Sequence, residues 1–563
     1  MNENFTILDD VESISSITPN EESPVFTEDE ILEGANLTPD ISTINSASSE
    51  SSKDSWTFPN DYATTDATRF FEFSGSSEKG ASTSGAHKDP YADYYETYAG
   101  EFIEFMKTNP TTYHTIIHFK SVLEKNNFQY LPQNKPIEDL SPGLYCTSRS
   151  DQCMIAFVIG GKWRPENGSC FVGSHCDALS VKLNPRGSLK KKVEGYELLG
   201  VAPYSGSLNK NWLNRDLGLA GAILVRDSNT GKISRKLVNS YPTPVAFIPE
   251  SEYVSDDTQY NKQTKMVPVF SYTNEVLEPT EEEKRSKFYN LHSLSLLRYI
   301  TQLSQTPINS IVDIDLDLVD VQPSSRGGLE NEFIYSASLD DRLCAFDSIY
   351  GLIEFSQRFF AGANIEEYDG ISGVYLVNNE EIGSMTSTGA YGGFLVDNLK
   401  SLVCNKRDRC HVEEATHRLL KNTVLLSSDV THAMNPNFKE VYLQGNYPLP
   451  NVGPSIKFDS NGHVLSDSLG KEFLDRVVNN LQGVKLQEFH IRNDSRSGGT
   501  IGPIMSDARR GLNGAKFIID VGLPILSMHS IRSVMGYKDV GIGVRFFKEV
   551  FSKWKDVIKE MDV

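Results

Sequence analysis

The chain has 563 residues, and its 54 lysines and arginines against 75 aspartates and glutamates give a formal net charge of −21. This acidic balance excludes a nucleic-acid-binding protein, which needs a surplus of basic residues. Hydrophobic residues make up 39% of the chain, so a length of two or three domains can form sizeable cores. The chain has no apolar run of about 18 residues and no secretory signal at its acidic start, and we therefore expect no membrane span and no signal peptide.

Residues 1–90 differ in composition from the rest of the chain. Residues 1–60 contain thirteen acidic residues and one basic residue, and residues 41–60 contain seven serines. So few apolar residues cannot build a core, and the sequence predicts a disordered tail over residues 1–90. Near its start Ile7, Val11 and Ile14 follow i, i+4, i+7 spacing, which indicates either a chance cluster or a docking helix.

Beyond residue 90 helical and strand patterns alternate. Helices are predicted over Tyr94–Met106 and Tyr113–Lys125. Apolar or β-branched segments bounded by Gly, Asn, Asp or Ser predict buried strands at 152–160, 170–174, 373–377, 423–426, 486–492 and 516–521. Helical spacing predicts further helices along 339–353, along 469–481 after a Ser466 cap, and along 547–558. The alternation predicts an α/β fold in which helices cover a mixed sheet.

Residues 182–332 interrupt this alternation. They are rich in Gly, Pro, Asn and charged residues and contain short candidate strands such as Ala222–Val225. We therefore expect a β-rich inserted domain over 182–332 and an α/β domain formed by 91–181 and 333–563.

Ionisable side chains gather where the predicted strands end, in the segments Gly173–Asp177, Asn378–Glu381, Ser427–Asp429 and Ser527–His529. In open α/β sheets, ligands bind beyond the carboxyl ends of the strands. Histidine and carboxylate ligands together suit zinc and its first-row neighbours. In His175-Cys176-Asp177 the carboxylate lies two residues on, where it can orient the imidazole of a metal ligand.

These groups also have structural interpretations. A histidine at a strand end is more often hydrogen-bonded than metal-bound, and acids such as Asp340 and Asp341 at a helix start favour the helix dipole. Asp429 and His432 are three residues apart and either face one pocket or cap a loop. Adjacent glutamates such as Glu380 and Glu381 are usually a solvated surface. At the end of an apolar strand they instead favour a site in which one binds metal and the other is a general base.

Six segments match, in order, the motifs of the M18 metallo-aminopeptidases, and the chain resembles this family from about Tyr91 to its C-terminus. The segments are Gly173-Ser-His-Cys-Asp-Ala-Leu, Leu339-Asp-Asp-Arg-Leu, Asn379-Glu-Glu-Ile-Gly-Ser, Ser428-Asp-Val-Thr-His, Gly498-Gly-Thr-Ile-Gly-Pro and Met528-His-Ser-Ile-Arg. Four further segments, which begin at Val201, Asn435, Asn493 and Lys538, resemble the fungal vacuolar subgroup more than the aspartyl aminopeptidases.

The resemblance implies two zinc ions per chain, bridged by Asp340. One ion would also be held by His175 and Asp429, and the other by Glu381 and His529. The family therefore implies a zinc-peptidase catalytic domain that hydrolyses the N-terminal bond of peptides.

The same resemblance implies roles for four more residues. Glu380 corresponds to the general base, Asp177 to the residue that supports the first histidine, and His432 and Lys457 to residues that touch substrate. Relatives also present a histidine from a neighbouring subunit after an Ile-Pro motif. Here Ile248-Pro249 continues as Glu-Ser-Glu-Tyr-Val without a histidine, which leaves the completion of the substrate pocket open.

Assembly and location follow from the resemblance in the same way. It implies that the inserted domain dimerises, that the dimers form a homo-dodecamer, and that neutral or apolar N-terminal residues are preferred. It also implies that the tail is a possible propeptide, recognised by a selective-autophagy receptor and delivered to the vacuole from the cytoplasm. A cytoplasmic location is the alternative.

Two other functions fit parts of the sequence. A di-zinc deacylase or carboxypeptidase would use the same ligand types, although the Gly498 and Met528 segments disfavour it. A catalytically weak, self-assembling cargo or scaffold protein is the non-enzymatic alternative.

Overall fold

The computed structural model describes residues 89–134, 140–253, 260–404, 411–495, 498–507, 509 and 511–561. The predicted tail, with Ile7, Val11 and Ile14, lies outside these residues. Within this part of the chain no helix is long and apolar enough to cross a lipid bilayer.

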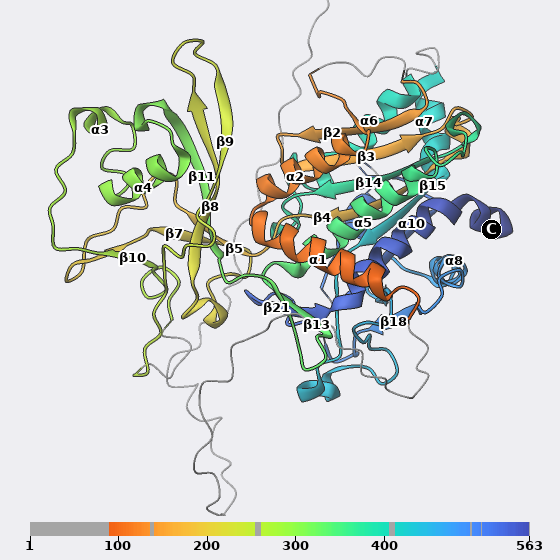
Figure 1. Ribbon diagram of the computed structural model, residues 1–563. Coiled ribbons are helices and arrows are strands. Elements are labelled where there is room, and N and C mark those ends of the chain that lie inside the picture. The colour runs from red at the N-terminus through yellow and green to blue at the C-terminus, as the bar shows by residue number, and fades with distance from the viewer. Residues whose placement is uncertain are drawn as a thin grey trace, which may run out of the picture. The chain divides into compact units, whose positions relative to one another are not determined.

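A nine-stranded mixed sheet carries the largest core (Figure 1). β14, β4, β15 and β19 run parallel, so their carboxyl ends lie at one edge of the sheet. All six predicted strands are present, with bounds that differ by at most two residues. The strands follow the order β1 (Gln129–Tyr130), β2 (Gly143–Arg149), β3 (Cys153–Ile159), β14 (Ile371–Val377), β4 (Ser169–His175), β15 (Thr423–Ser428), β19 (Phe517–Gly522), β17 (Ser455–Phe458) and β18 (Gln487–His490).

Helices cover both faces of this sheet. Successive side chains along its strands point to opposite faces, and each face packs against helices in its own apolar layer. On β4, Phe171 faces one layer and Val172 the other, and Tyr375 and Leu376 of β14 do the same. The layer that contains Val172 also contains residues of α1 (Ala92–Thr108), α2 (Thr112–Lys125), α5 (Leu339–Gln357), α8 (Ser468–Val478) and α10 (Tyr537–Glu560). The layer that contains Phe171 includes α6 (Phe394–Cys404), α7 (Val412–Lys421) and α9 (Ile501–Met505).

The predicted cap of α8 is wrong. The N-cap is Asp467, whose carboxylate accepts a hydrogen bond from the N–H of Gly470 at 2.8 Å. Ser466 is engaged by the sheet instead, because its hydroxyl donates to the carbonyl of Asp520 at 3.0 Å and accepts from the N–H of Asp520 at 2.9 Å. The helix also ends at Val478, before Leu481.

The C-terminal helix begins at Tyr537, well before the apolar spacing that starts at Phe547. Gly541 and Gly543 interrupt the apolar pattern in its first turns. A Cβ atom at Gly541 would lie 2.7 Å from the ring of Tyr95, and one at Gly543 would lie 2.0 Å from the carboxylate of Asp347. These glycines therefore let α10 pack closely against α1 and α5.

A second, antiparallel sheet lies within the segment predicted to be inserted, and it has its own apolar core. Its order is β7 (Val201–Tyr204), β5 (Ser180–Leu183), β11 (Ile311–Asp320), β8 (Leu217–Arg226) and β9 (Ile233–Asn239). The same segment holds the antiparallel pair β6 (Tyr196–Leu198) and β10 (Val269–Tyr272), and the helices α3 (Glu281–Arg285) and α4 (Leu294–Ser304).

A third sheet joins segments far apart in the sequence. It contains β12 (Ser325–Gly327), β13 (Phe333–Ser336), β21 (Ser533–Gly536), β20 (Pro524–Leu526) and β16 (Thr431–His432). Residue 182 lies within β5, which begins at Ser180. Residue 332 lies between β12 and β13, which pair in the same sheet. Neither position is therefore a boundary between sheets. The domain division at those positions stays a prediction.

Candidate metal centre

The carboxyl ends of three parallel strands meet at one edge of the nine-stranded sheet. His175 is the last residue of β4 and pairs in register with Val377, the last residue of β14. Asp429 directly follows β15, the neighbour of β4 on its other side. Asp340 comes from the start of α5. The fold therefore brings together residues that are far apart in the sequence.

His175, Asp340 and Asp429 form a compact buried cluster. One ligand atom from each of the three lies within 4.8 Å of the others. Nε2 of His175 is 3.1 Å from Oδ1 of Asp340 and 3.9 Å from Oδ1 of Asp429. The side chain of His175 is only 2% exposed, so water does little to screen the charges around it. An imidazole and two carboxylates in this arrangement are suitable ligands for zinc.

Asp340 directs its two carboxylate oxygens towards two different histidines. Oδ1 faces His175, and Oδ2 lies 3.3 Å from Nε2 of His529. Burial raises the pKa of Asp340, but hydrogen bonds from the two histidines outweigh it and hold that pKa well below its ordinary value. Asp340 and Asp341 have non-helical backbone angles, so the regular turns of α5 begin at Arg342. The position is suited to a carboxylate that bridges two cations.

Glu380 and Glu381 form the short 3-10 helix Glu380–Ile382 (η6) after β14. Oε2 of Glu380 lies 3.9 Å from Nε2 of His175. Oε1 of Glu381 is buried and has no hydrogen-bond partner among the described residues. Burial, reinforced by nearby carboxylates, raises the pKa of Glu380 to about 7 and that of Glu381 to about 9. A buried carboxylate without a partner is costly, and a bound cation would satisfy it.

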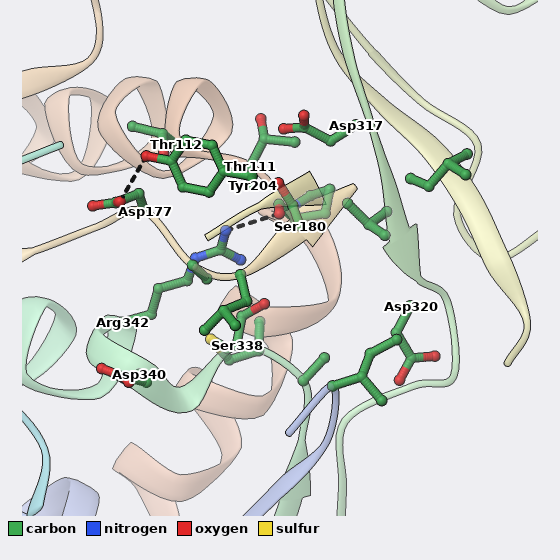
Figure 2. Close-up of a pocket in the computed structure, with 18 of the residues that line it drawn as sticks. Thr111, Thr112, Asp177, Ser180, Tyr204, Asp317, Asp320, Ser338, Asp340 and Arg342 are labelled. Carbon is green, nitrogen blue, oxygen red and sulfur yellow. Dashed lines mark hydrogen bonds between the residues drawn. The ribbon is translucent and has the colours of Figure 1, made fainter. Parts of the chain in front are cut away.

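Asp177 lies behind the cluster. Its Oδ1 is 3.5 Å from Nδ1 of His175 and accepts the N–H of Glu380 at 3.2 Å. Its Oδ2 accepts the N–H of Glu381 at 3.2 Å and the hydroxyl of Tyr204 at 2.8 Å (Figure 2). Sequence reasoning missed Tyr204, because its segment carried only a family resemblance and no spacing linked it to Asp177.

Lys457 and His432, the two residues predicted to touch substrate, differ in their exposure to solvent. Lys457 of β17 is buried, and its Nζ lies 3.7 Å from Oδ2 of Asp429. Burial lowers the pKa of Lys457, but the charges of Asp429 and Asp520 outweigh this and raise it, so the ammonium persists. His432 is exposed at the end of β16, with its ring 6.2 Å from that of Phe489. It does not belong to the compact cluster.

The segment after Ile248-Pro249 contributes no histidine. Ile248 is buried, and Glu250 accepts a hydrogen bond from the side chain of Asn214 at 2.8 Å.

A histidine and carboxylate cluster at the carboxyl edge of a mixed α/β sheet is typical of a metal-dependent enzyme. Comparison with known sequences identifies the kind. Residues 105–551 match the family described as aminopeptidase I zinc metalloprotease (M18), and the chain belongs to the M18 family. It is a metallo-aminopeptidase, a hydrolase of N-terminal peptide bonds, and zinc is the metal of its family.

Relatives share most of the chain. The protein is 40% identical over 479 residues to vacuolar aminopeptidase 1 of Saccharomyces cerevisiae, covering 83% of this chain and 90% of the relative. The solved dodecamer of mApe1 from the same yeast is similar with a TM-score of 0.72 at 38% identity, covering 83% of this chain and 99% of that one. A solved complex of Ape4 and Nbr1 contains a similar chain, with a TM-score of 0.75 at 29% identity and coverages of 84% and 88%. The predicted resemblance to the vacuolar subgroup is thereby confirmed.

Proposed function

We propose that this aminopeptidase binds two zinc ions per chain, and that Asp340 bridges them. The observation that carries the proposal is the placement of Oδ1 and Oδ2 of Asp340 beside His175 and His529. Asp429 would complete the His175 site, and Glu381, with its unpartnered Oε1, would complete the His529 site. Glu381 and His529 are not among the described residues whose ligand atoms all lie within 4.8 Å of one another. The proposed His529 site is therefore less compact than the His175 site.

Glu380 acts as the general base in this proposal. Zinc held by these residues would supply polarisation of the scissile carbonyl and would lower the pKa of a water molecule towards neutrality. The carboxylate of Glu380 accepts a proton as the water oxygen adds to the carbonyl carbon. It returns that proton to the leaving nitrogen as the C–N bond breaks. Asp177 orients His175 and, through two backbone N–H groups, the turn that carries Glu380.

Two neighbouring isosteric substitutions test this division of labour. Glu380→Gln removes a base but no zinc ligand, so we expect turnover of a leucyl anilide to fall by at least about 100-fold while zinc content is unchanged. Glu381→Gln weakens a ligand, and here we expect zinc to be lost together with turnover. Zinc content by elemental analysis and kcat on the same samples provide the comparison. A Glu380→Gln enzyme with a near wild-type rate would exclude the assigned base.

Assembly through the inserted segment is a further part of the proposal. Several large apolar side chains are exposed there, and exposed apolar side chains that lie together are typical of an interface. Tyr196 and Tyr272 pack against each other with ring centroids 4.9 Å apart. Leu189, Val193 and Val276 are also exposed. Together with the dodecameric relative, this supports dimerisation through the segment and a homo-dodecamer built from dimers. Sedimentation or light scattering of the purified protein would measure the oligomer.

The substrates and location that we propose rest on the relatives. The preference for neutral or apolar N-terminal residues that we propose rests on the motif resemblance to the vacuolar subgroup, and the vacuolar relative supports delivery to the vacuole. The complex of Ape4 with Nbr1 supports recognition by a selective-autophagy receptor, which in this chain we assign to the N-terminal tail and within it to the stripe of Ile7, Val11 and Ile14. Unchanged vacuolar delivery after deletion of residues 1–20 would contradict this assignment.

A further inference from the structure

Tyr204 connects the second sheet to the residues behind the metal centre. Tyr204 is the last residue of β7, an edge strand of the second sheet, whereas Asp177 follows β4 of the nine-stranded sheet. Its hydroxyl donates to Oδ2 of Asp177 at 2.8 Å (Figure 2). The same hydroxyl accepts a hydrogen bond from Nδ2 of Asn379 at 2.9 Å, and Asn379 directly precedes Glu380. Tyr204 thus touches both segments that end at the candidate metal centre.

The direction of these hydrogen bonds is fixed by Asn379. Its Oδ1 accepts from the hydroxyls of Thr386 and Thr388 at 2.8 and 3.1 Å, so its amide nitrogen must face Tyr204. Asn379 itself has a φ of 61°, the left-handed region that asparagine tolerates better than most residues. Because the hydroxyl oxygen of Tyr204 accepts from this amide, its hydrogen is left to bond Asp177.

Asp177 transmits this contact to the site. Its carboxylate is 2% exposed and accepts the backbone N–H groups of Glu380 and Glu381, both at 3.2 Å, with Nδ1 of His175 at 3.5 Å. The bond from Tyr204 is the shortest of these contacts and the only one in this set that comes from the second sheet. Without it, the carboxylate keeps only its two bonds to the backbone N–H groups of Glu380 and Glu381, and the turn that carries Glu380 is less firmly held. The ring of His175 is also held by the main-chain carbonyl of Asp177, 3.1 Å from Nδ1, so we expect the Glu380 turn to respond more than the imidazole.

We infer that Tyr204 is a positioning residue for zinc binding and peptide hydrolysis, which it serves through Asp177. The inference rests on the proposed function. If Tyr204 has this role, the second sheet helps to position the residues of the metal centre, in addition to any role in assembly. Partners of this kind that orient metal ligands typically change metal affinity or activity by about 10- to 100-fold when they are removed.

A Tyr204→Phe variant removes only the hydroxyl oxygen, and the chain offers a matched control. The hydroxyl of Tyr113, in α2, donates to Oδ2 of Asp315, in β11, at 2.9 Å, so it is also a tyrosine–aspartate bond between the same two parts of the fold. Asp315 contacts Lys182 and none of the proposed metal ligands. Tyr113→Phe therefore reports the general effect of losing such a bond.

Three quantities are measured on full-length wild type and both variants. They are zinc affinity by competition with a chromogenic chelator, kcat and KM on a leucyl anilide, and hydrogen exchange at the amides of Glu380 and Glu381 in chelated protein. We expect Tyr204→Phe to lower zinc affinity and kcat by about 10- to 100-fold, to leave KM within about threefold, and to accelerate exchange at the two amides. We expect Tyr113→Phe to match the wild type.

The outcomes separate this inference from the proposed function. Wild-type values in Tyr204→Phe would overturn the inference, and so would equal losses in the two variants. If the wild type itself neither binds zinc nor hydrolyses the anilide, the proposed function fails. Hydrogen exchange then still decides the positioning role. Faster exchange at Glu380 and Glu381 in Tyr204→Phe alone supports it, and unchanged exchange refutes it.

Discussion

Asp347 is a buried carboxyl group in the middle of α5 that plays no part in the proposed mechanism. Neither of its carboxylate oxygens has a hydrogen-bond partner among the described residues. Burial, with the charges of Asp539 and Asp341, raises the pKa of Asp347 well above its ordinary value. Burial also raises the pKa of Asp539, in the first turn of α10, to about 8. Both groups therefore keep their protons to a higher pH in the folded protein than in the unfolded chain.

These raised pKa values make stability depend on pH. The unfolded chain releases each proton near pH 3.8, whereas the folded chain retains it. The stabilisation is therefore complete below about pH 4 and is lost as the pH rises towards the folded pKa. One proton changes the free energy of unfolding by about 1.4 kcal/mol per pH unit. Asp347→Asn removes one of the two groups, so we expect the free energy of unfolding of the variant to fall less steeply than that of the wild type as the pH rises from 5 to 7, by at most about 1.4 kcal/mol per pH unit.

Urea unfolding at pH 5, 6 and 7 measures this difference. Protein and zinc concentrations must be held constant, because ligand binding and assembly shift apparent stability. Asp556→Asn, at an exposed position on α10, is the control and should show the wild-type pH dependence. Parallel curves for Asp347→Asn and the wild type would refute the reasoning, since they would mean that Asp347 is ionised in the folded protein.

Two further substitutions probe the surroundings of the metal centre. A Cβ atom at Gly502 would lie 2.8 Å from both carboxylate oxygens of Asp520, so Gly502→Ala should lower the free energy of unfolding by about 1–3 kcal/mol in urea, whereas Gly499→Ala, where the added atom meets open space, should be nearly neutral. Lys457→Met removes the ammonium beside Asp429 and leaves the ligands more negative, so zinc should be retained while kcat/KM on a leucyl anilide falls about tenfold. Faster loss of zinc to a chelator in Lys457→Met would instead assign this lysine to metal binding.

Six of the nine strands of the large sheet are predicted because they are short, mostly apolar segments with clear ends, whereas β1, β2 and β17 are not predicted. Failures arise where one side chain has two possible uses. Ser466 has the right position and chemistry for a helix cap, but its hydroxyl bonds the backbone of Asp520 and leaves the cap to Asp467. The start of α10 is not predicted because close helix packing requires glycine at positions 541 and 543. The apolar spacing by which a helix is predicted is therefore missing there.

The candidate site could be predicted only in part, for a related reason. His175, Asp340 and Asp429 follow strands or begin a helix, and the parallel register brings such positions to one edge. Tyr204 lies in a separate sheet and reaches Asp177 only through the folded contact between sheets. No periodicity encodes that contact. The exposed position of His432 likewise depends on the third sheet, whose strands come from distant segments.

The central claim is a zinc pair bridged by one carboxylate, and zinc content per chain tests it most directly. Elemental analysis would be made on purified wild type and on Asp340→Ala after dialysis against dilute zinc. The account predicts about two zinc ions per wild-type chain, and a large loss from both sites in Asp340→Ala together with the loss of turnover. A wild type that holds a single zinc ion, or an Asp340→Ala protein that keeps both, would contradict it.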